Sequence, residues 1–396
     1  MNSTSLEGQF SIVAQTDRPP SPPRVLKQGD SFIVFDPRGD IAAADASEHG
    51  FYHAGTRFLS RFELLLSGHH PLLLSSTISD DNALFSADLT NPDLLRDGQV
   101  VIPHGSIHLF RTRVLWLDSC IERIRLSSYM PHPVTVTLTL CFGADFVDVF
   151  EVRGTRRVRR GKDLGIEIER EEQVLRYGGL DGMERRTRMR FDKMAQAVEN
   201  GLVKFVMPLQ PAVPRDIEIR VSCERGDKPN KSETYPNAVL LVRRERAERA
   251  ARGCRVSSSN EALNRWTRRS TADLHMMQTD TSHGPYPYAG IPWFSTPFGR
   301  DGLITALQLL WADPGVARGV LSFLAATQAT SASDDQDAQP GKILHEMREG
   351  EMPALGEVPF ARYYGSADAT PLFVVLAHAY FERTGDRGFI ARLWPH

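Results

Sequence analysis

The chain has 396 residues, of which 41% are hydrophobic and 24% are charged. This length exceeds that of one ordinary hydrophobic core, so we expect two domains. The formal net charge of −2 gives no general reason to expect binding to nucleic acid or to an anionic membrane surface. No stretch approaches the roughly 18 apolar residues that cross a bilayer.

The first 28 residues are polar, with prolines at 19, 20, 22 and 23. We predict a disordered tail over 1–28, which lacks the basic start and apolar run of a secretory signal. The four cysteines, Cys120, Cys141, Cys223 and Cys254, are widely spaced and form no CxxC or metal-ligand spacing. They indicate free thiols in a reducing compartment. We therefore expect a cytoplasmic protein with neither a metal nor a cofactor.

From 29 to about 241 the apolar residues mostly alternate with polar ones. The run from Val134 to Leu140 is an example, and the runs 31–35, 203–206, 217–221 and 238–242 are also predicted as strands. Glycine, proline and aspartate interrupt these runs at short intervals, for instance over 36–40 and 226–230. The basic stretch 156–162 indicates a solvated loop. Many short strands with frequent turns predict a large antiparallel β-sandwich domain over 29–245.

The apolar period changes after Arg243. Ser258 and Glu261 have the spacing of a helix-capping box, and four apolar residues then follow on one helical face: Leu263, Trp266, Leu274 and Met277. We predict a linker helix within 246–280.

From Arg300 the sequence predicts pairs of helices. One apolar stripe contains Leu303, Ala306, Leu307 and Leu310, and Asp313-Pro314 then starts a second helix with its own stripe at Val316, Val320, Phe323 and Leu324. The pattern recurs after Asp368 and ends at Thr384-Gly385-Asp386. Stacked αα-hairpins are therefore expected over 281–396, with functional loops at one end of the stack.

An aromatic loop runs from Gly290 into Arg300 and Asp301, where a helix begins. Flat rings such as Trp293 and Phe294 can cover the apolar face of a sugar, while a guanidinium and a carboxylate bind its hydroxyls. The alternative is an aromatic loop packed for stability beside a helix-capping ion pair.

Asp368 begins the first helix of the next hairpin, and the segment between the two helices contains His345 and Glu346. If the hairpins lie side by side, these polar residues share one rim with Arg300 and Asp301, as a sugar site requires. The alternative for both aspartates is N-terminal capping. His345 is interpreted as a loop residue that forms hydrogen bonds rather than as a catalytic base.

Several segments resemble the bacterial glycogen-debranching (amylo-α-1,6-glucosidase-like) family. They are 290–294, 298–302 and 364–373, together with 35–40, 50–60 and 144–154, which are similar to that family's N-terminal β domain. Arg300-Asp301 also resembles the pair with which glucoamylase-type (α/α)6 barrels hold the terminal glucose. The resemblance implies a β + α multidomain protein, a β-sandwich followed by a partial (α/α)6 toroid.

The resemblance further implies an α-glucosidase-type glycoside hydrolase that acts on α-glucans or oligosaccharides by inverting acid/base hydrolysis. Arg300 and Asp301 would hold the terminal sugar and Trp293 and Phe294 would shape its pocket, with Glu346 and Asp368 as rim contacts.

A toroid of twelve helices needs well over ~200 residues, so the residues after Arg300 provide only its first pairs. We therefore expect a fragment that lacks the catalytic acid and base, and whether the chain is an enzyme stays open. Asp368 is a low-ranked candidate acid, since that role requires a raised pKa. The alternative is a noncatalytic carbohydrate-binding or assembly protein. Uncovered helix faces carrying Phe373, Leu376 and Trp394 predict self-association.

Overall fold

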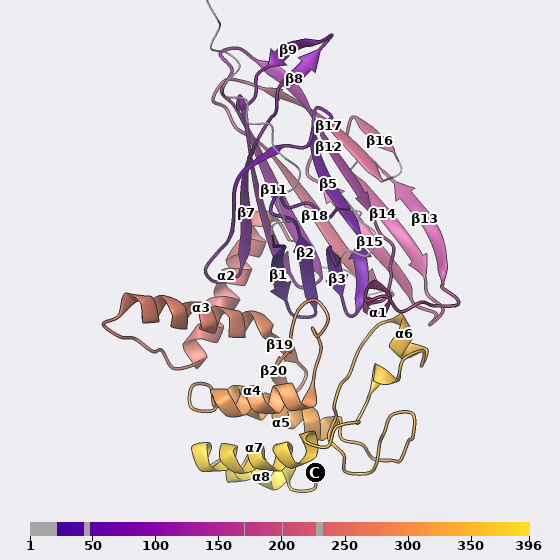
Figure 1. The fold of residues 1–396 in the computed structure, drawn as a ribbon, viewed down its shortest axis with the longest axis vertical. Helices are drawn as coiled ribbons and strands as arrows, with labels where there is room; N and C mark the ends of the chain where they lie inside the picture. Colours follow the sequence, from indigo (N-terminus) through magenta and orange to yellow (C-terminus); the bar gives the residue numbers. More distant parts are fainter. Residues whose placement is uncertain (1–21, 43–47, 170, 200, 227–232) are drawn as a thin grey trace, which may run out of the picture.

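The computed structural model describes residues 22–42, 48–169, 171–199, 201–226 and 233–396. A β domain fills the upper part of Figure 1, and a helical layer lies below it. The first sheet consists of β1 (Arg24–Gln28), β2 (Ser31–Phe35), β3 (Gly50–His53) and β4 (Thr56–Leu59), in that order. The second has eight strands in the order β13 (Lys162–Ile168), β14 (Glu172–Gly178), β15 (Glu184–Phe191), β18 (Arg215–Arg225), β11 (Ser119–Ser128), β10 (Ile107–Trp116), β7 (Leu84–Thr90) and β6 (Leu72–Ile78).

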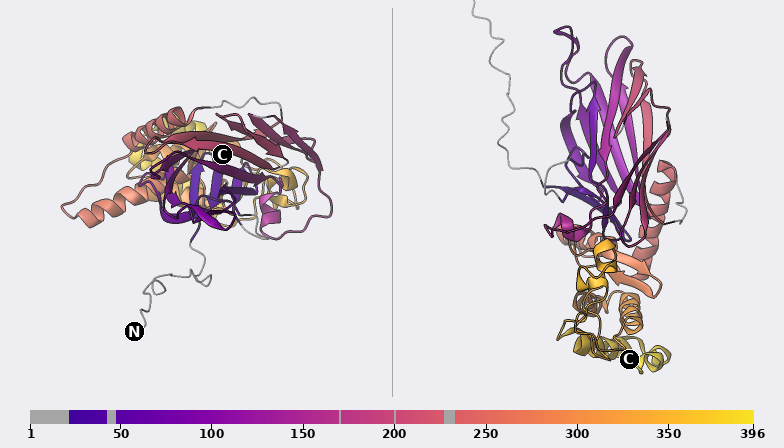
Figure 2. Two further views of the ribbon diagram at one scale, coloured as in Figure 1. Left: turned by 90° about the horizontal axis from the view of Figure 1, so that it is seen from above. Right: turned by 90° about the vertical axis from the view of Figure 1, so that its right-hand side faces the viewer.

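A third sheet orders β16 (Ala197–Glu199), β17 (Leu202–Leu209), β12 (Val134–Gly143) and β5 (Arg61–Leu66). The strands β8 (Leu94–Arg96) and β9 (Gln99–Ile102) form a separate hairpin. Neighbouring strands of the described sheets pair antiparallel. The predicted antiparallel architecture is therefore confirmed, and Figure 2 shows the sheets facing one another as two layers.

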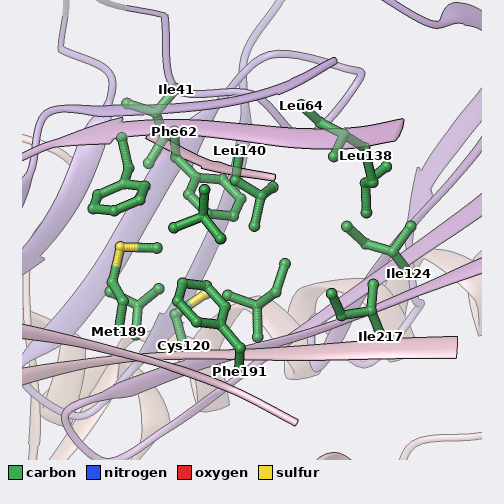
Figure 3. Packing of buried hydrophobic residues seen from close by; sticks show 14 of the residues in the cluster. Ile41, Phe62, Leu64, Cys120, Ile124, Leu138, Leu140, Met189, Phe191 and Ile217 are labelled. Carbon is green, nitrogen blue, oxygen red and sulfur yellow. The ribbon is translucent and has the colours of Figure 1, made fainter. Parts of the chain in front are cut away.

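The core lies between these layers. Leu138 and Leu140 of β12 point inward because alternate residues of a strand share one face. Ile124 of β11 and Ile217 of β18 face them from the eight-stranded sheet (Figure 3). Burial of this kind contributes roughly 1.5–3 kcal/mol per large apolar side chain, so the alternation seen in the sequence is what holds the two layers together.

Two boundaries of the β domain differ from the prediction. The predicted tail 1–28 contains β1, which pairs along its whole length with β2, while residues 1–21 lie outside the described residues. The predicted strand 238–242 belongs to the helix α2 (Tyr235–Arg252). Thr234 and Pro236 start this helix, and Ala238 and Val242, one turn apart, pack on β10 and β11. A short apolar run does not distinguish strand from helix, and most of the predicted turn 226–230 lies outside the described residues.

The helix α3 (Glu261–Met277) begins later than its predicted cap. Asn260, not Ser258, is the N-cap, and its side chain accepts hydrogen bonds from the backbone of Ala262 and Leu263. The described part of the chain buries none of the α3 side chains, and Trp266 is 66% exposed. The connection from sandwich to helical layer is thus two helices rather than the single predicted one.

The helical layer begins with the hairpin of β19 (Gln278–Thr281) and β20 (Gly284–Pro287). Its helices are α4 (Gly299–Leu309), α5 (Pro314–Ala326), α6 (Glu351–Ala354), α7 (Ala369–Thr384) and α8 (Arg387–Leu393), with a 3-10 turn over Pro359–Ala361. Figure 1 shows α4 and α5 stacked above α7 and α8, as the predicted αα-hairpins require. Asp313 caps α5 and Gly385 ends α7 in the left-handed conformation, both as predicted.

The predicted uncovered faces are only partly correct. Phe373 and Leu376 are buried in the core of the helical layer, because α7 turns them toward α4 and α5. Trp394 is 85% exposed, and Val374 and Val375 on the other side of α7 are also exposed. Among the described helices, none is both long and apolar enough to span a bilayer.

Candidate functional site

A cavity of about 540 Å³ lies where the helical layer meets the β domain. We call it the interdomain pocket. Both domains contribute to its lining, which consists of Phe150, Arg153, Ala289, Gly290, Phe294, Phe298, Arg300, Asp301, His345, Glu346, Arg348 and Phe360. Of the six sequence-predicted site residues, four line the pocket, and Trp293 and Asp368 lie outside its lining.

The start of α4 is fixed against the loop that precedes α6. The backbone N–H of Gly299 donates to the carbonyl of His345 over 2.9 Å. A Cβ atom at Gly299 would lie only 1.8 Å from the carbonyl oxygen of Leu344, so this close approach excludes any side chain there. Arg300 and Asp301 follow at once and are thereby held at the edge of the pocket.

The structure brings the starts of α4 and α7 together. Nη1 of Arg300 lies 3.2 Å from Oδ2 of Asp368. Asp368 occupies the N-cap position of α7, but its side chain makes no capping hydrogen bond. The hydroxyl of Ser366 instead accepts from the backbone N–H of Ala369 over 3.3 Å. The capping interpretation is therefore wrong for Asp368.

The surroundings of Asp368 do not suit a general acid. The hydrogen bond from the hydroxyl of Ser366, followed by the interaction with the Arg300 guanidinium, lowers the pKa of this carboxyl below its usual value. A general acid at neutral pH requires the opposite shift, since it must keep its proton. In this structure Asp368 is the ion-pair partner of Arg300, and its role as a general acid stays a prediction.

Asp301 is the carboxylate of the pocket that is open to a ligand. Its side chain makes no hydrogen bond or ion pair with any residue that the structure describes. Beneath it, the buried hydroxyl of Tyr286 donates to the carbonyl of Phe298 over 2.8 Å. Burial, and secondarily the nearby Asp301 carboxylate, raises the pKa of Tyr286, so this tyrosine stays neutral.

Glu346 and Arg348 form a buried ion pair within the pocket lining. Arg348 also donates to the carbonyl of Trp293 over 2.8 Å, and its guanidinium lies 5.0 Å from the ring centre of Phe150. Glu346 lines the pocket as a buried residue whose carboxylate is bound by Arg348, and its role as a rim contact for a sugar stays a prediction. This pair forms a fixed part of the pocket wall.

The two predicted aromatic residues have different positions. Phe294 lines the pocket, is 45% exposed, and meets Phe298 edge to face with ring centres 5.9 Å apart. Trp293 packs behind the pocket on the cluster of Val149, Phe150 and Met352. Trp293 therefore supports the pocket from outside, and the surface open to a ligand is that of Phe294.

Sequence reasoning missed the pocket residues Phe150, Arg153 and Arg348. The first two belong to the segment 144–154, whose resemblance pointed only to a β domain. Phe150 forms part of α1 (Val149–Val152) and Arg153 follows it, and no local pattern shows that this turn contacts the helical layer.

The Nδ1 atom of His345 is buried without a hydrogen-bond partner, and its ring instead packs edge to face on Phe298 and Tyr363. The predicted hydrogen-bonding role of its side chain is not seen at that atom.

Buried carboxylates attach α6 to the β domain. One oxygen of Asp148 accepts from the backbone of Phe150, and the other accepts from Met352 over 3.2 Å. Burial raises the pKa of Asp148 to about 6, so it is mostly ionised at neutral pH. Glu351 accepts from the hydroxyl of Tyr177 over 2.9 Å and from the backbone of Leu180 over 2.7 Å.

Arg157 completes this attachment. Its Nη1 lies 3.2 Å from Glu351, and its Nε lies 2.7 Å from Glu357. The side chain is only 1% exposed. The prediction of 156–162 as a solvated loop therefore fails for Arg157, which faces carboxylates of the helical layer instead of water.

An antiparallel β-sandwich followed by αα-hairpins, with an Arg-Asp pair at the start of a hairpin, is the arrangement of a glucoamylase-type fold with an N-terminal β domain. Residues 26–220 match the family described as the N-terminal domain of (some) glycogen debranching enzymes. This β domain belongs to that glycogen-debranching family. No curated protein matches the sequence.

Solved structures with the same fold include the two that follow. One, from the human microbiome and provisionally named a kojibiose phosphorylase, is 10% identical with a TM-score of 0.64, and the match covers 92% of this chain and 54% of that one. The other is a bacterial glucoamylase complexed with acarbose, 11% identical with a TM-score of 0.51, and the match covers 90% of this chain and 55% of that one. The chain thus spans about half the length of each. The described residues contain no group of three or more His, Cys, Asp or Glu side chains that could hold a metal ion.

Proposed function

We propose that the interdomain pocket binds the terminal sugar of an α-glucan or a related oligosaccharide. The observation that carries this proposal is the Asp301 carboxylate, which lies open beside Arg300 and Phe294 in a cavity of about 540 Å³. Such a volume is typical of small-molecule sites. The named relatives, a phosphorylase of kojibiose and a glucoamylase, support a carbohydrate as the ligand.

Each group has a part in holding the sugar. The Asp301 carboxylate accepts hydrogen bonds from ring hydroxyls, and the Arg300 guanidinium donates to them, both charge-assisted. The exposed ring of Phe294 covers the apolar C–H face of the sugar. Asp368 keeps the Arg300 side chain in place for this contact.

The pocket supports recognition better than catalysis. Inverting hydrolysis needs a carboxylic acid and a carboxylate about 6.5–9.5 Å apart, with the acid's pKa raised. Glu346 is bound by Arg348, and the pKa of Asp368 is lowered. We therefore propose that these 396 residues hydrolyse α-glucans negligibly. The same observation favours the second candidate, a noncatalytic carbohydrate-binding protein.

The proposal is tested by titration calorimetry of the 396-residue chain with glucose, maltose and isomaltose, alongside a glucose-release assay. Asp301→Ala is expected to weaken binding about tenfold or more, because a charge-assisted hydrogen bond contributes roughly 1.5–3 kcal/mol. The matched control is Asp335→Ala, at an exposed position outside the pocket. Absence of binding by the unaltered chain would overturn the proposal. Robust glucose release would show instead that a catalytic pair is already present.

We further propose a cytoplasmic location. Its support is the state of the cysteines: Cys120, Cys141 and Cys223 are buried free thiols, and Cys254 is an exposed one. Free thiols are typical of a reducing compartment. Labelling of the chain in its native cell, followed by fractionation, tests this location.

Self-association is proposed for the exposed apolar side chains of the last helices. Trp394 lies beyond α8, and Val374 and Val375 lie on the outer side of α7. Exposed apolar patches of this kind mark association surfaces. Analytical ultracentrifugation of the chain and of Trp394→Ser should show a shift toward the monomer in the variant.

A further inference from the structure

The β domain supplies one wall of the interdomain pocket through α1. Figure 1 shows this short helix at the lower end of the sandwich, next to α6 of the helical layer. Phe150 lies within α1, and Arg153 is the residue that ends it. Both line the pocket that also contains Arg300 and Asp301. The site is therefore built by two domains.

The position of α1 is firmly defined. Asp148 and Glu151 form a reciprocal capping box, in which Asp148 accepts from Phe150 over 3.1 Å and Glu151 accepts from Asp148 over 3.0 Å. The second oxygen of Asp148 accepts from Met352 of α6. A Cβ atom at Gly350 would lie 2.4 Å from that oxygen, so the contact leaves no room for a side chain at position 350. The Arg153 backbone is thus held at a fixed distance from the helical layer.

Arg153 differs from the other two arginines of the pocket. Arg300 is paired with Asp368, and Arg348 is paired with Glu346. Arg153 is exposed, and no carboxylate among the described residues pairs with it. Its guanidinium lies 5.5 Å from the ring centre of Phe294 and 6.0 Å from that of Trp293. Its donors are therefore available, and the rings restrict where they point.

Phe294 contacts pocket residues of both domains. One side of its ring is near Arg153, and its edge contacts Phe298, which immediately precedes α4 and thus Arg300. If Arg300 and Asp301 hold the terminal sugar as proposed above, Arg153 remains in the same lining as a donor from the other domain for a unit attached to that sugar. The volume of about 540 Å³ lies in the range for drug-sized ligands, which are larger than one six-carbon sugar.

We infer that Arg153 binds hydroxyls of the second sugar unit, so that the β domain distinguishes the terminal sugar of a chain from a free monosaccharide. This inference rests on the proposed function, because it assigns the terminal sugar to Arg300 and Asp301. It adds a specificity-determining residue from the β domain. The chemical class of the ligand is an α-linked disaccharide or longer oligosaccharide, and a free monosaccharide does not reach Arg153.

The test compares the affinities of glucose, maltose and isomaltose for the full chain and for Arg153→Ala and Arg153→Lys. The matched control is Arg156→Ala, a nearby exposed arginine outside the pocket lining. Arg153→Ala should weaken binding of at least one disaccharide about tenfold, the effect of a lost charge-assisted bond, and leave glucose binding within about twofold. The disaccharide affinity of Arg153→Lys should fall between those of the unaltered chain and Arg153→Ala, because a lysine keeps the charge but not the forked geometry.

The outcomes separate this inference from the proposal beneath it. If Arg153→Ala weakens glucose and both disaccharides equally, Arg153 is a general wall residue and the inference is overturned while the sugar site stands. An unchanged affinity for both disaccharides also overturns it. If the unaltered chain binds no sugar, the proposed function fails, and the inference fails with it. A circular dichroism melt of each variant within about 2 °C of the unaltered chain shows that the fold is kept.

Discussion

Arg300 and Asp368 are 68 residues apart in sequence, and their charged groups lie 3.2 Å apart. A second pair, Arg318 and Asp386, has the same separation of 68 residues and a distance of 2.8 Å. The first pair joins the starts of α4 and α7, and the second joins α5 to the start of α8. The two αα-hairpins are thus stacked in register, with equivalent ion pairs at equivalent places.

This repetition provides a matched comparison for the site. Arg300→Ala should weaken sugar binding about 10- to 100-fold, because it removes charge-assisted donors of roughly 1.5–3 kcal/mol. Arg318→Ala removes an arginine of equal exposure, 49% for each side chain, outside the pocket. It should leave affinity unchanged. Titration calorimetry with maltose measures both variants, and an equal loss in the two would mean that the effect is structural.

The pair of Glu346 and Arg348 predicts a non-additive response. Glu346→Gln leaves a buried guanidinium without its carboxylate, which should lower the free energy of unfolding by about 3–5 kcal/mol. The double variant Glu346→Gln with Arg348→Met should recover much of that stability, since the uncompensated charge is gone. Urea denaturation measures the whole cycle.

The control for this cycle is the exposed pair of Arg244 and Glu248. Glu248→Gln should change the free energy of unfolding by less than about 1 kcal/mol. If the double variant at 346 and 348 were no more stable than Glu346→Gln alone, the pair would contribute through packing rather than through charge.

Gly350 is predicted to tolerate no side chain. Its φ of 133° is unfavourable for other residues, and an added Cβ would meet Asp148 at 2.4 Å. Gly350→Ala should therefore destabilise the protein by more than the roughly 1–2 kcal/mol of a left-handed alanine. Gly385→Ala, at φ 65° with open space around it, supplies that reference value. Thermal unfolding measures both variants. If the two melting temperatures fell equally, Asp148 would move aside from the added Cβ without a loss of stability.

Lys27 predicts a pH dependence of stability. Its ammonium is buried, donates to Thr279 over 3.0 Å, and burial lowers its pKa from 10.5 to about 7. Between pH 7 and 10.5 the unfolded chain binds more protons at this site than the folded chain does. The free energy of unfolding should then rise with pH, by up to about 1.4 kcal/mol per pH unit, and this contribution should be constant below pH 7.

The measurement is urea denaturation at pH 7, 8 and 9. Lys27→Met should lack the upward slope, whereas Lys162→Met, at an exposed position, should retain it. Other titrating groups cancel when each variant is compared with the unaltered chain. Parallel curves for the chain and Lys27→Met would mean that Lys27 keeps its ordinary pKa.

The sequence patterns predicted the fold well where burial has a regular period. Alternation in β12 and the stripe of α5 follow directly from which face is covered. The run 238–242 failed because five apolar residues fit either period, and only the proline at 236 and the charged residues after it favour a helix. Turn signals placed Asp313 and Gly385 correctly, since capping is local chemistry.

The candidate site was predictable only on the side of the helical layer. Arg300 and Asp301 follow a distinctive aromatic loop, so residue type alone singled them out. The segment that contains Arg153 has no residue pattern that indicates a binding site. Arg153 reaches the pocket only because α1 packs against α6, and these two helices are about 200 positions apart in sequence, as the Asp148–Met352 hydrogen bond shows. The burial of Glu346 was not predictable, because its partner, two residues away, gives no sign in the sequence that both are buried.

The attachment of Glu351 to Tyr177 and Leu180 has a thermodynamic consequence. The Glu351 carboxylate belongs to α6, and its partners Tyr177, Leu180 and Arg157 all belong to the β domain, so α6 is part of the sandwich as much as of the helices. Melting of either domain would expose this carboxylate and its arginine, so the two should unfold as one cooperative unit. A sugar in the pocket would then raise the melting temperature of the whole chain, strands included, although it touches few of them.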